Sequence, residues 1–406
     1  MSDLPVLIIG AGISGLALAQ SLLRHQIPFR IYERDTLFNQ RSQGYRVRIG
    51  GDGIKALKSC LTHDLYTRLD KSCAQVTTKG TGPLWKLDAL SAEEIKTGPP
   101  PGSKAPAAIH EEVQPLNADR SVLRNVLMRD LQPYVEFGKE FGSFEVLQAG
   151  LKVRFCDGSE VDGRLLVGAD GASSRVRRRL VPGYRQIDTQ GRFIYGKTVM
   201  TEKLRQNFQA KCLQGLSIVQ DTSHEVPLTL LLEPVLFKDN EFRRDLPDDY
   251  VYWVILARKD RYDVGDHQLL SLSNADVAAL ARRTTSHWHS SFHALFDLQD
   301  TIQTSMIRII SAPIDIPDWE ASNKVTLIGD AVHVMSPTSG VGAATALRDA
   351  AKLGSSLAGQ TDQEKALLDY EGTMRAWASD AIMRSQVVGK LLFGMPPFNE
   401  IDCTKA

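Results

Sequence analysis

The sequence predicts an α/β fold in which a nucleotide-binding domain is interrupted by a mainly antiparallel sheet. A strand-like apolar run at residues 6–9 leads into a glycine-rich turn and an apolar helix. A second apolar run, ending at Ile328, leads into another turn and helix. Between about residues 184 and 304, strand-like segments alternate with charged turns, which is typical of an antiparallel sheet.

The first turn carries a G-x-G-x-x-G pattern formed by Gly10, Gly12 and Gly15, and the next strand ends at Glu33. In this pattern the first glycine permits a tight turn and the second lets a pyrophosphate approach the backbone. The third lets helix and strand pack closely, and the acid is placed to hydrogen-bond an adenosine ribose. We therefore predict a Rossmann-like domain with a mixed sheet that binds a dinucleotide.

The turn near the far end of the chain reads Gly329-Asp330, and two further glycines precede a helix over residues 343–357. A strand that delivers Asp330 to this turn aims its carboxylate at the same point as the free N–H groups of the helix. A carboxylate accepts hydrogen bonds from a sugar hydroxyl. A helix N-terminus beginning at Gly342 and Ala343 favours negative charge. The pattern predicts a second contact with the same ligand.

A third motif, Asp170-Gly171, follows the apolar run at residues 165–168. A hairpin with an Asp-Gly turn at Asp157 is expected just before it. Taken alone, Asp170-Gly171 would be another surface turn and the arginines within 175–179 a solvated basic face. Its position between the other two motifs favours a functional interpretation.

The three motifs together resemble the class A flavoprotein monooxygenases, the superfamily of para-hydroxybenzoate hydroxylase. The resemblance runs from Val6 to about Leu357, and the fungal secondary-metabolism hydroxylases are the most similar branch. It implies that the glycine pattern and Glu33 bind the adenosine half of FAD. It also implies that Asp170 serves FAD and NAD(P)H together, and that Asp330 reaches the ribityl chain.

Further cofactor contacts follow from the same resemblance. The family places an arginine at the FAD phosphates, and Arg120 is the matching position. Arg46 and Arg48 flank Val47 on an expected strand, so both arginines share one face, where relatives hold the flavin and the nicotinamide phosphate. Arg34, directly after Glu33, completes the predicted set. The helix start at residues 342–343 is expected to face the flavin pyrimidine oxygen.

Arg192 and Tyr195 are the candidates for acting on the substrate, because a phenol needs help in losing a proton. Their spacing of three puts them on opposite faces of a regular strand, so at most one faces the flavin unless a bulge intervenes. In the family, NAD(P)H reduces FAD and O₂ adds to form a C4a-hydroperoxide. The distal oxygen of that species then passes to an electron-rich carbon.

Three functions remain open at this point. The first is hydroxylation of an aromatic or polyketide-type small molecule in secondary metabolism. The second is epoxidation of an indole, terpenoid or other unsaturated polycycle, and the third is an FAD-dependent reductase or dehydrogenase. A non-catalytic FAD-binding transport protein is disfavoured because all three motifs are intact. We expect non-covalent FAD, and the sequence leaves NADH and NADPH equally open.

The order of the motifs predicts a discontinuous architecture, with helices near residues 275–291 and 363–390 and a loop at Lys96–Ser103. The expected division assigns residues 1–75, 106–183 and 305–360 to the FAD-binding domain, 76–105 and 184–304 to the substrate domain, and 361–406 to a C-terminal helical segment.

Composition agrees with an enzyme that acts on a small molecule and O₂. The 406 residues are 43% hydrophobic, with 48 Lys+Arg and 48 Asp+Glu, which disfavours nucleic acid or a membrane surface as a partner. Five cysteines without C-x-x-C spacing predict reduced thiols. A strand beginning near residue 5 leaves no room for a signal peptide, and no apolar run is long enough to span a membrane. We expect a cytoplasmic monomer or homodimer.

Two groups of histidines have ordinary structural explanations. His287, His289 and His293 cluster around Trp288, but no adjacent glutamate or cysteine completes a metal-binding pattern, so we predict no metal. His333 follows the Gly329-Asp330 motif and is expected to pack or hydrogen-bond beneath that loop.

Overall fold

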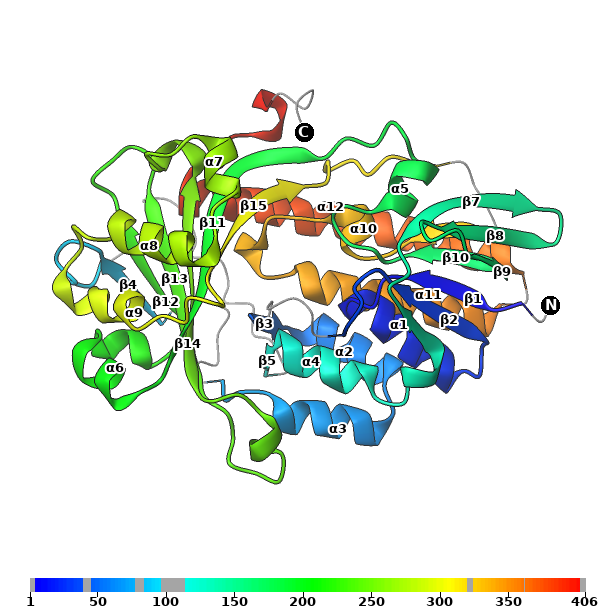
Figure 1. Ribbon diagram of the computed structural model, residues 1–406, viewed down its shortest axis with the longest axis horizontal. Coiled ribbons are helices and arrows are strands. Elements are labelled where there is room, and N and C mark those ends of the chain that lie inside the picture. The colour runs from blue at the N-terminus through cyan, green and yellow to red at the C-terminus, as the bar shows by residue number, and fades with distance from the viewer. Residues whose placement is uncertain are drawn as a thin grey trace, which may run out of the picture.

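The computed structural model describes residues 4–38, 45–76, 84–95, 114–319, 324–360 and 362–401. Two large sheets lie at opposite ends of the molecule, with long helices running between them (Figure 1). This arrangement confirms the predicted α/β class. The loop expected at Lys96–Ser103 lies outside the described residues.

A parallel sheet of five strands forms one end of the molecule. All of its pairings are parallel, so across the described residues this sheet is parallel rather than the mixed sheet that the sequence predicted. The innermost strands are apolar and buried, as expected for strands covered on both faces. In spatial order the strands are β16 (Val325–Leu327), β10 (Leu165–Gly168), β1 (Val6–Ile9), β2 (Phe29–Glu33) and β6 (Val135–Phe137).

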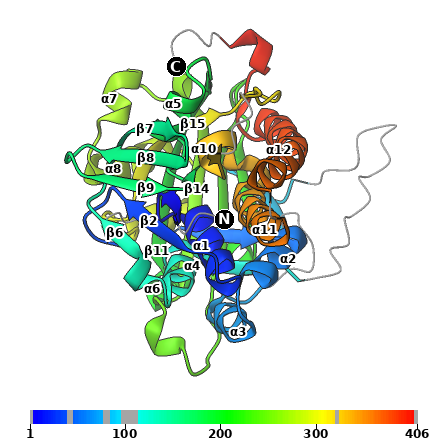
Figure 2. The same ribbon diagram turned by 90° about the vertical axis from the view of Figure 1, so that its right-hand side faces the viewer.

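Helices cover one face of this sheet and a small antiparallel sheet covers the other (Figure 2). On the helical side lie α1 (Ile13–Arg24), α11 (Gly342–Gly359) and α12 (Gln363–Phe393). The opposite side carries β7 (Phe141–Leu147), β8 (Gly150–Phe155) and β9 (Glu160–Gly163). The expected Asp-Gly turn joins β8 and β9, where Gly158 has φ +84°.

A six-stranded sheet forms the other end of the molecule. It is antiparallel except that β4 and β12 run parallel. Strand β11 is the longest, and its register shifts between Asp188 and Arg192. In spatial order the strands are β15 (Ser305–Ser311), β11 (Ile187–Val199), β14 (Tyr250–Arg258), β13 (Leu228–Val235), β12 (Ser217–Asp221) and β4 (Trp85–Asp88).

The two faces of this second sheet have different surroundings. One face packs on short helices (Figure 1), namely α6 (Glu202–Asn207), α7 (Asp266–Leu270), α8 (Asn274–Thr284) and α9 (His293–Asp297). The other face is rich in aromatic side chains and is turned toward the parallel-sheet half. Residues 305–311 pair with β11, so the chain rejoins the parallel sheet only at Val325. The division into domains remains a prediction.

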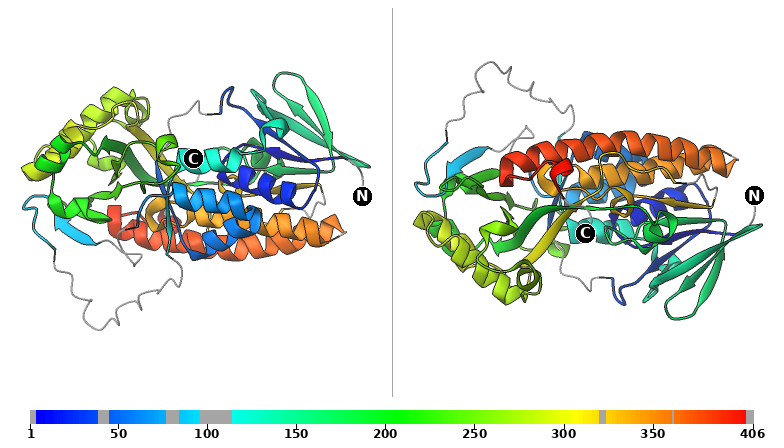
Figure 3. Two further views of the ribbon diagram at one scale, coloured as in Figure 1. Left: turned by 90° about the horizontal axis from the view of Figure 1, so that it is seen from below. Right: turned by 90° about the horizontal axis from the view of Figure 1, so that it is seen from above.

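The remaining elements connect the two halves. Strands β3 (Arg46–Ile49) and β5 (Leu116–Asp119) form a two-stranded ribbon, which leads into α2 (Gly51–Cys60) and α4 (Arg120–Met128). Helix α12 runs beside α11 and reaches β13 and β14 (Figure 3). Three further short helices are α3 (His63–Ser72), α5 (Arg175–Leu180) and α10 (Asp330–His333).

Within the described part of the chain, the helices include none that is both long enough and apolar enough to cross a membrane.

We predict that Gly15→Ala lowers the stability of the ligand-free protein, whereas Gly12→Ala does not. A Cβ on Gly15 would lie 2.1 Å from the Gly10 carbonyl oxygen, while a Cβ on Gly12 meets nothing within 4 Å. The expected loss for Gly15→Ala is about 1–3 kcal/mol, as for other overpacked sites. Urea unfolding of both variants measures this, and equal midpoints would contradict it.

Candidate cofactor and active site

All three sequence motifs follow strands of the parallel sheet, and parallel strands end at one edge. The glycine loop follows β1, Glu33 ends β2, Asp170 follows β10 and Asp330 follows β16. These four strands are neighbours in the order β16-β10-β1-β2. Ligands of open parallel sheets bind outside the carboxyl ends of the strands. The fold thus brings the predicted cofactor residues of these motifs to one edge.

The glycine loop has the geometry that the sequence predicted. Gly10 has φ +111°, and a Cβ there would lie 2.4 Å from the Ala169 carbonyl oxygen. Gly15 packs against Gly10, whereas the space beside Gly12 is open. The first and third glycines therefore serve the packing of the loop, and the second leaves room for a group to approach the backbone.

Two of the helices that start at this edge, α1 and α11, lack side-chain caps. Neither α1 nor α11 has a side-chain cap or an acidic residue in its first turn. By contrast, α3, α4, α8 and α12 are capped by Thr62, Asp119, Ser273 and Asp362. Uncapped N–H groups at a helix start favour an anionic ligand. The residues present thus fit a dinucleotide that carries an anionic diphosphate.

Glu33 is held against the glycine loop. One of its carboxylate oxygens accepts a hydrogen bond from the Ala11 N–H at 2.8 Å, and the other accepts one from the Asp35 N–H at 3.0 Å. Arg124 donates to the Ala11 carbonyl at 3.2 Å. Arg34 follows Glu33 with its side chain about half exposed, at 47%.

Asp170 is turned toward its own helix. Its carboxylate accepts hydrogen bonds from the Ser174 hydroxyl at 2.5 Å and the Arg175 N–H at 2.7 Å, so it stabilises the start of α5. Arg177 would lie on a solvated basic face if the motif were only a surface turn, but it is buried. It donates to the Ala331 carbonyl at 2.8 Å, and burial lowers its pKa. The arginine therefore joins the Asp170-Gly171 and Gly329-Asp330 turns, a role that the run of arginines concealed.

The Gly329-Asp330 turn rests on buried polar contacts. Gly329 has φ +61°, and its N–H donates to Asp349 at 2.7 Å. His333 bonds to the same carboxylate at 2.6 Å, which confirms the hydrogen bonding expected of it beneath this loop. Asp330 itself is exposed at the start of α10, so its carboxylate is available to a ligand. Asp349 could have been noticed as an acid within the apolar stripe of α11.

The β3–β5 ribbon connects the predicted cofactor residues to the six-stranded sheet. Arg46 forms an ion pair with Glu233 of β13, and Arg48 lies 3.9 Å from the same carboxylate. The two arginines therefore share one face, as predicted, while Val47 packs on the other side against the main core. Arg46 also donates to the Asn117 side chain at 2.9 Å. The sequence analysis did not identify Glu233 as a functional residue, because it lies in an otherwise apolar strand.

Arg120 begins α4 at the end of the ribbon, where its N–H donates to the Tyr45 carbonyl at 2.9 Å. The preceding Asp119 is fully buried and caps the helix. Asp119 also accepts hydrogen bonds from Lys197 at 2.8 Å and Tyr250 at 2.9 Å, both on the six-stranded sheet. This buried acid was not recognised in the sequence, although it fixes the position of Arg120 relative to that sheet.

The structure brings Tyr195 toward the predicted cofactor residues. Its ring centroid lies 5.0 Å from that of Tyr45 and 6.4 Å from that of Tyr252. Burial raises the pKa of Tyr195 well above its usual value, and the neighbouring tyrosines raise it further, while Arg120 opposes the shift. Tyr195 is therefore a neutral phenol that is able to donate a hydrogen bond.

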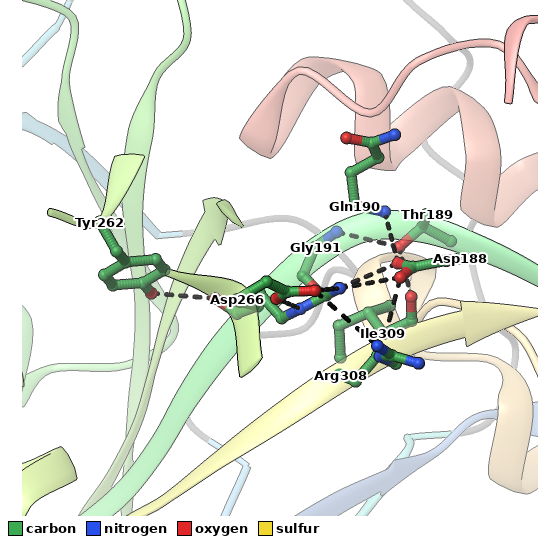
Figure 4. Close-up of polar contacts among 9 residues, drawn as sticks. Asp188, Thr189, Gln190, Gly191, Tyr262, Asp266, Arg308 and Ile309 are labelled. Atoms are coloured by element: carbon green, nitrogen blue, oxygen red, sulfur yellow. Dashed lines mark hydrogen bonds and ion pairs between the residues drawn. The ribbon is translucent and has the colours of Figure 1, made fainter. Parts of the chain in front are cut away.

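Arg192 lies on the opposite face of β11, as the spacing of three predicted. Its guanidinium binds two carboxylates, Asp188 and Asp266, at 2.6–2.9 Å, and the carbonyl of Gly191 at 2.9 Å. These bonds use all five of its N–H groups. Figure 4 shows Asp188 and Asp266 converging beside Arg308. The geometry disfavours a contact between Arg192 and a substrate.

The charge of Arg192 acts on both carboxylates. Burial raises the pKa of Asp188, but the hydrogen bonds and charge of Arg192 outweigh it and the net shift is downward. The hydrogen bonds from Arg192 also lower the pKa of Asp266. Both acids are therefore ionised in the folded protein across the neutral range.

The clustered histidines bind protein groups. His287 bonds to Asp221 at 2.7 Å, and His293 bonds to the Trp288 carbonyl at 3.0 Å. No group of three or more His, Cys, Asp or Glu side chains suited to a metal ion occurs among the residues described.

These features define a dinucleotide-binding α/β protein with a second sheet facing the cofactor edge. A family model for an FAD binding domain matches residues 283–385. A protein from Photorhabdus luminescens named as an FAD containing monooxygenase has a similar crystal structure, with a TM-score of 0.79 and 27% identity. The match covers 96% of this chain and 99% of that one.

Fungal relatives give the same result. The dual O-methyltransferase/FAD-dependent monooxygenase elcB of Phaeosphaeria nodorum is 37% identical over 444 residues, covering 98% of this chain and 47% of that protein. The protein CTB3 of Cercospora beticola, of the same description, is 37% identical over 423 residues, covering 99% and 47%. The chain spans about half the length of these curated relatives. Over nearly its whole length, the chain is similar to proteins that are described as FAD-dependent monooxygenases.

We predict that Arg192→Ala is destabilising, because it leaves two partly buried carboxylates without their common partner. The free energy of unfolding should fall by about 3 kcal/mol near pH 7. Since the folded pKa values of Asp188 and Asp266 are depressed, the stabilisation is present above their unfolded values and is lost as pH falls through the folded values. The deficit of the variant should therefore shrink in acid.

Urea unfolding at several pH values measures this effect. Arg308→Ala is the matched control, because Arg308 is 43% exposed and lies 3.7–3.8 Å from the same carboxylates. It should cost less than about 1 kcal/mol. An Arg192→Ala protein as stable as this control would contradict a structural role for Arg192.

Proposed function

We propose that the protein is an FAD-dependent, NAD(P)H-consuming monooxygenase that hydroxylates an aromatic or polyketide-type small molecule in secondary metabolism. One observation carries this proposal. Tyr45 and Tyr195 lie in mutual contact on the aromatic face of the six-stranded sheet, and Arg120 is close enough to influence both phenols. A planar electron-rich substrate stacks favourably on such a surface.

The residues of the parallel-sheet edge supply the cofactor site in this proposal. The start of α1 holds the FAD diphosphate, Glu33 the adenosine ribose and Asp330 the ribityl chain. Arg120 neutralises phosphate charge. The first turn of α11, at Gly342 and Ala343, stabilises negative charge at the flavin pyrimidine by its free N–H groups. Bound FAD, reduced by NAD(P)H, supplies the activation of O₂.

Tyr195 orients the substrate rather than acting as a base. Because its pKa is raised, its phenol keeps its proton and donates a hydrogen bond to a substrate oxygen. Holding the substrate carbon in one position favours oxygen transfer over loss of hydrogen peroxide. Arg192 supports the strand that carries Tyr195, since both lie in β11.

The relatives support the metabolic setting. Two of the fungal proteins named above are described as dual O-methyltransferase/FAD-dependent monooxygenases. O-methylation acts on hydroxyl groups, so pairing it with a hydroxylase is chemically consistent with a phenolic or polyketide-type substrate. We infer the same substrate class for this chain.

The decisive experiment measures NAD(P)H oxidation, O₂ uptake and product together, with a panel of phenolic and polyketide-type aromatics. One oxygen atom from ¹⁸O₂ should appear in a hydroxylated product. An epoxide would favour the epoxidase alternative, and product formed without O₂ would establish a reductase instead. Either outcome would overturn the proposal.

We expect Asp330→Ala to lose FAD during gel filtration. The exposed carboxylate is the proposed acceptor for a ribityl hydroxyl, and its removal leaves that donor unpaired, costing about 1–3 kcal/mol of binding free energy. Flavin absorbance per protein measures occupancy. Asp318→Ala is the control, because Asp318 is also exposed and pairs with Arg375 outside the cofactor edge. Full FAD retention by Asp330→Ala would show that this contact is absent.

We expect Tyr195→Phe to keep its FAD and to oxidise NAD(P)H while losing product. The substrate loses a hydrogen-bond donor, so the ratio of product to hydrogen peroxide should fall about tenfold for an interaction of about 1.4 kcal/mol. Tyr262→Phe is the control, since Tyr262 is equally buried but donates to the Arg192 carbonyl. Unchanged coupling in Tyr195→Phe would transfer the orienting role to another residue of the aromatic face.

A further inference from the structure

A single buried carboxylate holds the Gly329-Asp330 turn. His333 Nε2 lies 2.6 Å from Asp349 Oδ2, and both side chains have no exposed surface. The same Asp349 oxygen accepts the Gly329 N–H at 2.7 Å, and the other oxygen accepts Trp377 Nε1–H at 3.0 Å. Asp349 therefore joins α10, α11 and α12 directly behind Asp330.

The charge of this carboxylate is balanced by His333. Across the described residues, no lysine or arginine is ion-paired with Asp349, and the adjacent Arg348 lies over the Trp377 ring and near Asp52. A buried carboxylate is costly unless a positive partner accompanies it. Protonated imidazole would supply this partner through Nε2, whereas the buried Nδ1 of His333 has no hydrogen-bond partner among the described residues.

The groups around His333 favour this protonated form. Burial lowers the pKa of His333, but Asp349 and then Asp330 raise it, and the net shift is upward. The other titratable groups facing α10 and the turn have hydrogen bonds to backbone carbonyls. These are Arg177 to Ala331, Tyr184 to Val332, and Tyr370 of α12 to Leu327.

We propose that His333 and Asp349 are positioning residues that hold the Gly329-Asp330 turn in its FAD-binding conformation and couple FAD binding to proton uptake by His333. The inference rests on the proposed contact between Asp330 and FAD. Neither residue touches the reacting atoms. Their effect passes through Gly329 to Asp330, and through α11 to the helix start at Gly342.

The coupling follows from the short length of the turn helix. Helix α10 has four residues, so Asp349 and its partners supply much of what holds it in place. Opening of the turn in the FAD-free protein would expose His333 to water, where its pKa returns toward the ordinary value of about 6.5. FAD favours the closed turn and therefore the protonated imidazole.

The upward shift in the pKa of His333 determines how FAD affinity changes with pH. Because the folded pKa of His333 is raised, its contribution is fully present below the ordinary value and is lost as pH rises through the raised value. FAD affinity should therefore fall with rising pH over that interval. Each pKa unit by which FAD raises the value corresponds to about a tenfold change in affinity.

Titration calorimetry of FAD into the FAD-free full chain, in buffers of different ionisation enthalpy, measures the proton taken up. We expect uptake of a fraction of one proton at a pH between the ordinary value of about 6.5 and the raised value. His333→Gln keeps an N–H donor near the Nε2 position but has no titrating group, so it should take up none and its affinity should be flat with pH. His287→Gln, at a 48% exposed histidine, should behave as the unaltered protein.

A charge-matched pair of variants tests the role of Asp349. Asp349→Asn removes the counter-charge of His333 and should weaken FAD binding with no proton uptake. Combining it with His333→Gln leaves a neutral amide pair, which should restore part of the lost affinity, because neither charge is then buried alone. A double variant weaker than the product of the single effects would overturn the pairing.

The unaltered protein gives an independent measurement should a variant fail to fold. Imidazole ¹⁵N resonances of histidine-labelled protein report the pKa of His333 with and without FAD. A higher value with FAD supports the proposal, and equal values overturn it, as does proton uptake that persists in His333→Gln. Asp330→Ala separates the two ideas: full FAD affinity in that variant contradicts the cofactor contact. FAD loss there alongside normal proton linkage in His333→Gln contradicts only the positioning role.

Discussion

The constraint on which the site depends is the close approach of backbone to backbone at the edge of the parallel sheet. Gly10 lies so near the Ala169 carbonyl that even one methyl group would not fit. Backbone hydrogen bonds join the neighbouring strands on both sides of this contact. The Gly10 N–H donates to the Tyr32 carbonyl, and the Ile328 N–H donates to the Gly168 carbonyl. The three motif-bearing loops are thereby placed by main-chain geometry before any side chain contributes.

Side-chain charges then fix what the backbone leaves free. Arg177 joins the Asp170-Gly171 and Gly329-Asp330 loops through a buried guanidinium, and Asp349 holds the second of these loops from behind. Asp119 and Glu233 make the corresponding connections to the six-stranded sheet. Each of these groups is buried and has its partner on another element, so each stabilises one relative placement of two elements and penalises others.

Sequence analysis recovered the features that depend on local pattern. The glycine spacing, the turn at Asp330 and the helix that became α12 are all encoded within short windows. The alternation of a strand also put Arg192 and Tyr195 on opposite faces correctly. The alternation of side chains does not show which face of the strand lies toward the cofactor edge. The answer depends on which surface of the sheet the short helices cover.

The remaining features depend on partners far away in the sequence. Arg192 bonds to Asp266, which lies 74 positions along the chain. The sequence around Arg192 therefore does not show that carboxylates occupy its guanidinium. Asp170 matches a motif associated with cofactors, yet its carboxylate stabilises the start of α5, because Ser174 and Arg175 lie within reach. Arg177 looked solvated because its neighbours are arginines, and only the packed tertiary structure reveals its burial.

The buried links between ribbon and sheet have a consequence for exchanging parts between relatives. A chimera that takes only the six-stranded sheet from a relative could lose the partner of Asp119, which is Lys197. It could also place a side chain other than Glu233 opposite Arg46. Swapping the sheet together with β3 and β5 keeps both ion pairs intact. In such an exchange the six-stranded sheet and the ribbon therefore form one unit, even though the ribbon precedes most of the sheet in the chain.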